Sequence, residues 1–101
     1  MTNQEINEAV ARKLGNDLRV YNKVDVYKKQ PNGNYILTQI PAYCTSISAA
    51  WEIVLSVKGR IELHRRYDKW KCWLRDEIEA GQADTAPMAI CLAFLKLEDT
   101  K

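Results

Sequence analysis

The chain has 101 residues, 47% of them hydrophobic, which is enough for one domain with a core of its own. No apolar run approaches the roughly 20 residues of a transmembrane helix, and the polar first residues are unlike a signal peptide. The chain has three cysteines without a close pair, which argues against a disulfide framework. Its net charge of +2 is weak support for nucleic-acid binding. We therefore expect a single cytoplasmic domain over residues 1–101, outside the membrane.

The first part of the chain predicts a helix and then a β-hairpin. Thr2 or Asn3 can cap a helix of about three turns whose apolar residues recur at helical spacing until Gly15. Residues 18–27 alternate between apolar and polar side chains, as in one half-buried strand. After a turn, residues 35–40 are expected to return as its antiparallel partner.

A second helix is predicted from Thr45, Ser46 or Ser48 to the glycine at position 59. Its expected buried face comprises Ile47, Ala50, Trp51, Val54 and Leu55. Trp51 is therefore expected in the core.

The last part of the chain predicts a second hairpin and a third helix. Residues 61–65 and 70–74 alternate as strands around a turn at 67–69. Residues 77–84 read as a polar loop, and residues 86–97 as a well-buried apolar helix.

Capping chemistry marks the start of that third helix. The Thr85 hydroxyl can accept a hydrogen bond from an unpaired N–H of the first turn. Asp84 complements the positive helix end, and Pro87 stands where no N–H partner is needed.

The expected fold is α+β, in the order α-β-β-α-β-β-α. Two hairpins would join into one four-stranded, mainly antiparallel sheet, and the helices would cover its faces. The prediction is thus an α/β/α layered sandwich.

Several stretches make the chain resemble the phage ABA-sandwich family of small phage and prophage proteins, and the related NinX-like phage proteins. The matching stretches are residues 5–11, 49–54, 70–73 and 85–91. The resemblance implies an α/β/α sandwich and a phage accessory setting in an infected bacterial host. It implies no catalytic residue.

Cysteine and histidine could also indicate chemistry. Cys44, Cys72 and Cys91 have no paired spacing with His64, so we expect no metal site, no cofactor and no enzyme. A nucleophilic pair of His64 with Cys72 or Cys44 stays an alternative, because such partners meet in space. Buried structural thiols are the favoured interpretation.

The second hairpin concentrates positive charge. Residues 58–75 hold seven basic and two acidic side chains, a balance of +5. Basic groups interleaved with aromatic rings can bind phosphates and stack on bases, although a solvated hairpin surface is the alternative. The candidate ligand-binding residues are Arg65, Arg66, Tyr67, Lys69, Lys71, Trp73 and Thr85.

These observations favour a non-enzymatic phage accessory protein that binds a small, nucleotide-type anion. Such binding could sequester a nucleotide signal of host defence. The alternatives are a protein-interaction module and a weak nucleic-acid binder. We also expect a homo-oligomer, a dimer, because the apolar, alanine-rich final helix and the tyrosine-rich strands of so small a domain can leave surface that a second copy buries.

Overall fold

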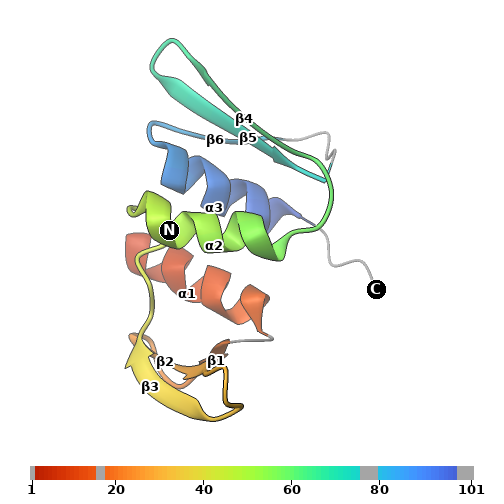
Figure 1. Ribbon diagram of the computed structural model, residues 1–101. Coiled ribbons are helices and arrows are strands. Elements are labelled where there is room, and N and C mark those ends of the chain that lie inside the picture. Colours follow the sequence, from red (N-terminus) through yellow and green to blue (C-terminus); the bar gives the residue numbers. More distant parts are fainter. Residues whose placement is uncertain (1, 16–17, 76–79, 98–101) are drawn as a thin grey trace.

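The computed structural model describes residues 2–15, 18–75 and 80–97 and shows three layers, with helices between two sheets (Figure 1). The helices are α1 (Asn3–Leu14), α2 (Ile47–Ser56) and α3 (Ala86–Lys96). The strands are β1 (Leu18–Val20), β2 (Asp25–Lys29), β3 (Tyr35–Gln39), β4 (Ile61–Arg66), β5 (Lys69–Leu74) and β6 (Gly81–Ala83). No helix among these residues is long and apolar enough to cross a bilayer.

The α+β class is confirmed, but the single four-stranded sheet and the α/β/α layer order were wrong. Strands β1-β2-β3 form one antiparallel sheet and β4-β5-β6 form another. The first packs on α1 and the second on α3, so the helices fill the space between them (Figure 1). Each hairpin gains its third strand locally, and the apolar face of each sheet is covered by its own helix.

Asn22 divides the segment that was predicted as one strand. Its side-chain oxygen accepts hydrogen bonds from the backbone N–H groups of Val24 and Asp25, both at 2.8 Å. This local turn reverses the chain between β1 and β2. Val24, expected on the buried side, is consequently exposed.

Gly81 explains why the predicted loop before α3 contains a strand. Strand β6 lies so close to α3 that a Cβ on Gly81 would overlap the backbone nitrogen of Ala93 and the carbonyl oxygen of Ala89. Both alanines are buried, so small residues on each side permit the close approach. Residues 77–79 of the predicted loop lie outside the described residues.

Helix α2 buries only part of the face that its sequence predicted, Ala50 and Val54, and adds Ile53 to it. Ala50, Ile53 and Val54 enter the core. Trp51, by contrast, is 49% exposed and Leu55 75% exposed. Because α2 packs mainly against α3, only a narrow side of it is covered.

The helix caps differ in strength. Thr2 and Glu5 form a reciprocal capping box at the start of α1, with hydrogen bonds of 3.1 and 3.2 Å. The hydrogen bond from the backbone N–H of Thr2 to the Glu5 carboxylate is the main cause that lowers the pKa of this carboxyl. Thr85 is the residue before α3 as expected, but its side chain makes no capping hydrogen bond. The capping role predicted for the Thr85 side chain was therefore wrong.

We expect Thr2→Ala to lower the free energy of unfolding by about 1 kcal/mol, because an N–H of the first turn loses its acceptor. Thr85→Ala should cost less than half as much, since no bond is lost. Urea denaturation of the two variants measures this difference. A loss at Thr85 as large as that at Thr2 would contradict it.

Candidate anion-binding face

Strand register places basic and aromatic side chains on the outward side of the second sheet. His64 is directly opposite Lys71, and Arg66 is directly opposite Lys69. Opposed residues of an antiparallel pair point to the same side of a sheet. We call His64, Arg66, Lys69, Lys71 and Trp73 the basic face. Glu62, directly opposite Trp73, lies on the same side, and no helix layer covers this side of the sheet (Figure 1).

The two arginines of the hairpin lie on opposite sides of the sheet. Arg65 is paired in register with Trp70, on the side that faces α3, whereas Arg66 belongs to the basic face. Arg65, Arg66, Lys69 and Lys71 are therefore not one cluster. Because only alternate residues of a strand share a face, we expect one arginine to matter more than the other for binding, and the register favours Arg66.

The positive charges of the basic face differ in their partners. Lys69 forms an exposed ion pair with Asp84. No described carboxylate forms an ion pair with Arg66 or Lys71. Arg66 and Lys71 are diagonal neighbours across the two strands, roughly 7–8 Å apart at their backbones. They are the charges best placed to hold an anion.

Tyr67 occupies the tip of the β4–β5 hairpin in a strained conformation. Its φ of 57° lies in the left-handed region, which an aromatic residue rarely adopts. The side chain is 85% exposed, and the guanidinium carbon of Arg66 lies 5.7 Å from its ring centroid. The register pairs Arg66 with Lys69, so Tyr67 is the first residue of a two-residue hairpin turn, a position where positive φ is common.

The two tryptophans of β5 are three residues apart, so they point to opposite sides of the sheet. Trp70 packs against the core, whereas Trp73 lies on the basic face. The rings of Trp73 and His64 meet edge to face, with centroids 5.5 Å apart. His64 was missed as a binding candidate, and the alternation of β4 residues was the signal that could have revealed it.

Thr85 lies away from the basic face, at the start of α3. It lines a cavity of about 460 Å³ together with Lys69, Asp84, Cys44 and Asn3. Thr85 and Lys69 therefore line this cavity, whereas Arg66 and Lys71 do not. The candidate residues are thus divided between the cavity and the basic face.

The three thiols are buried and free, as expected. Burial raises the pKa of Cys72 to about 11 and that of Cys91 to about 12, and it also raises the pKa of Cys44. His64 and Cys72 lie on opposite sides of the sheet, because Cys72 is paired in register with Leu63. The alternative of a His64–Cys72 nucleophilic pair was therefore wrong.

Comparison with known proteins places the chain in a family. The family model of the phage ABA sandwich domain matches residues 8–95. The chain belongs to the phage ABA sandwich domain family. The resemblance inferred from its motifs is thereby confirmed.

A solved structure shares the fold of this ABA sandwich protein. It is a phage protein from Bacillus cereus ATCC 14579, with a TM-score of 0.68 and 21% sequence identity over 99% of this chain and 93% of that one. The curated proteins contain no significant match to the chain. Within residues 2–15, 18–75 and 80–97, no three His, Cys, Asp or Glu side chains are grouped as metal ligands.

Proposed function

We propose that this ABA sandwich protein binds a nucleotide-type anion on the basic face and acts without catalysis. The observation that carries the proposal is the strand register, which brings Arg66 and Lys71 to one uncovered side together with Trp73. Arginine holds phosphate oxygens bidentately, lysine adds attraction, and an aromatic ring can stack on a base. Sequestration of a nucleotide signal of host defence in the infected cell requires only such affinity.

Arg66→Ala and Lys71→Ala are each expected to weaken nucleotide binding about tenfold, the effect of losing one charge-assisted hydrogen bond of roughly 1.5 kcal/mol. Isothermal titration calorimetry with ATP and a cyclic dinucleotide measures the change. Arg65→Ala is the matched control, because it removes the same charge from the other side of the sheet. Equal losses from Arg65 and Arg66, or no binding by the wild type, would refute the assignment.

Tyr67 provides an independent variant for the same test. Tyr67→Gly places at the turn a residue that adopts positive φ freely, so the melting temperature should not fall. Binding should still weaken if the ring contributes to recognition. Equal affinity in this variant would remove Tyr67 from the site.

The open surface of a sheet can also accept a longer strand. Single-stranded nucleic acid is therefore the second candidate ligand, because basic and aromatic side chains follow one another along β4 and β5. Short oligonucleotides that bind far better than mononucleotides, with an affinity that falls steeply with salt, would support this candidate.

We further propose that the protein self-associates through α2. Ile47, Trp51 and Leu55 are spaced four residues apart and are all exposed, so they form an apolar stripe along one side of the helix. A second copy could bury this stripe symmetrically. The final helix, by contrast, is buried within the chain and is not available for such a contact.

Light scattering is expected to show a dimer at tens of micromolar, and Trp51→Lys is expected to yield a monomer. Leu37→Lys is the control, because Leu37 is equally exposed on β3 but lies away from the stripe. A wild-type monomer throughout this range would refute the dimer, as would loss of the dimer in the Leu37 variant.

A further inference from the structure

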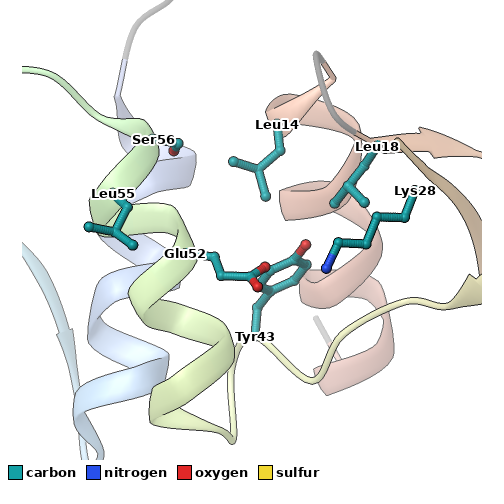
Figure 2. Close-up of a pocket in the computed structure, with 7 residues that line it drawn as sticks. All are labelled: Leu14, Leu18, Lys28, Tyr43, Glu52, Leu55 and Ser56. Carbon is teal, nitrogen blue, oxygen red and sulfur yellow. The ribbon is translucent and has the colours of Figure 1, made fainter. Parts of the chain in front are cut away.

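A cavity of about 440 Å³ lies between α1, α2 and the first sheet, on the other side of the helix layer from the basic face (Figures 1 and 2). This volume is within the range of small-molecule pockets. Three leucines form its apolar lining: Leu14, Leu18 and Leu55. Its polar lining comprises Lys28, Tyr43, Glu52 and Ser56, and the Ser56 hydroxyl already donates to the carbonyl oxygen of Ile53.

The hydroxyl of Tyr43 is the unusual group in this cavity. The residue is 0% exposed, and its hydroxyl has no hydrogen-bond partner among the described residues. Buried polar groups nearly always have one. In Figure 2 the amino group of Lys28 points toward the hydroxyl side of the Tyr43 ring, and the carboxylate of Glu52 points toward the ring from α2. Burial and the negative charge of Glu52 both raise the pKa of Tyr43, so the hydroxyl is a protonated donor.

The charges around this hydroxyl are complementary but unpaired. Neither Lys28 nor Glu52 forms an ion pair with another described residue. The cavity thus offers a cation, an anion and a buried donor. A purely anionic ligand would meet the carboxylate of Glu52, and a purely cationic ligand would meet the ammonium of Lys28.

The apolar lining defines the rest of a ligand. Leu18 is buried and Leu14 is partly buried, whereas Leu55 is 75% exposed. An apolar group that entered the cavity would contact these leucines.

We infer that this cavity binds a small zwitterion with an apolar body, the chemistry of an apolar α-amino acid. The carboxylate of the ligand accepts hydrogen bonds from Lys28 Nζ and Tyr43 Oη. Its ammonium group donates to the carboxylate of Glu52. Its apolar side chain packs against the leucines. The site is separate from the basic face, so it does not depend on the proposed nucleotide binding.

Calorimetry with L-leucine and L-phenylalanine as probes tests this inference on the full chain. At least one of them is expected to bind, and the analogue of the binding amino acid that lacks the ammonium or the carboxylate should bind at least tenfold more weakly. For leucine these analogues are 4-methylpentanoate and L-leucinamide. No binding of either amino acid at millimolar concentration, or equal binding of an analogue, would overturn the inference.

Three variants locate the site. Tyr43→Phe keeps the shape of the ring and removes only the unpartnered hydroxyl, so it should fold normally and bind at least tenfold more weakly. Glu52→Gln and Lys28→Met should have the same effect.

Lys29→Met is the matched control, because Lys29 follows Lys28 on β2 and points to the other side of the sheet. Arg66→Ala should also leave amino-acid binding unchanged. Unchanged binding in Tyr43→Phe, or an equal loss in Lys29→Met, would overturn the site.

Discussion

Gly81→Ala is expected to lower the free energy of unfolding by about 3 kcal/mol. The reason is the direct contact of β6 with α3. A Cβ at this position would overlap backbone atoms of Ala89 and Ala93, and it would lie 2.8 Å from the Ala93 Cα. Backbone atoms cannot rotate away as a flexible side chain can, so strand and helix would have to separate.

Urea denaturation monitored by circular dichroism measures this effect. Gly33→Asn is the matched control, because Gly33 lies in an open turn with nothing within 4 Å of an added Cβ. Asn tolerates the positive φ of 89° at this turn better than most residues. The control should change the free energy of unfolding by less than about 1 kcal/mol. A Gly81→Ala protein as stable as the wild type would show that β6 and α3 are not in contact.

Ile53→Ala is expected to lower the free energy of unfolding by about 3 kcal/mol. Ile53 is 0% exposed in the core, and its truncation would leave a cavity among residues that can only partly relax. Leu55→Ala removes a side chain of the same size from the same helix and should cost less than about 0.5 kcal/mol, because that side chain is exposed.

This pair of variants decides which face of α2 is buried. Thermal or urea unfolding of both, under the same conditions, measures the difference. The face predicted from sequence contains Leu55 and omits Ile53. If that face were buried, Leu55→Ala would lower the free energy of unfolding more than Ile53→Ala. That opposite order would contradict the packing of α2 against α3.

The error in α2 has a physical cause. Ile47, Ala50, Trp51, Ile53, Val54 and Leu55 are apolar around most of the helix. Periodicity then identifies a helix but not the side that is buried. The neighbouring helix decides that side, and α3 offers Ala50, Ile53 and Val54 a partner while Trp51 and Leu55 stay outside.

The basic face illustrates the same division. The concentration of positive charge at residues 58–75 and the opposite directions of Trp70 and Trp73 were visible in the sequence. The ion pair of Lys69 with Asp84 was not, because these residues are far apart in the chain and meet only when β6 is placed beside β5. Alternation along β4 could have added His64 to the candidates, since that pattern depends on local backbone geometry alone.

The sequence by itself determined what depends on local chemistry: the three helices, the two hairpins, the thiols that suit burial, and the motifs that place the chain in the phage ABA sandwich family. Only the tertiary structure decided that the hairpins remain in separate sheets with the helices between them (Figure 1). It also decided the role of Gly81 and the isolation of the Tyr43 hydroxyl. The physical reason is that spacing and capping act within a few residues, whereas close approach and burial depend on which distant segments share the core.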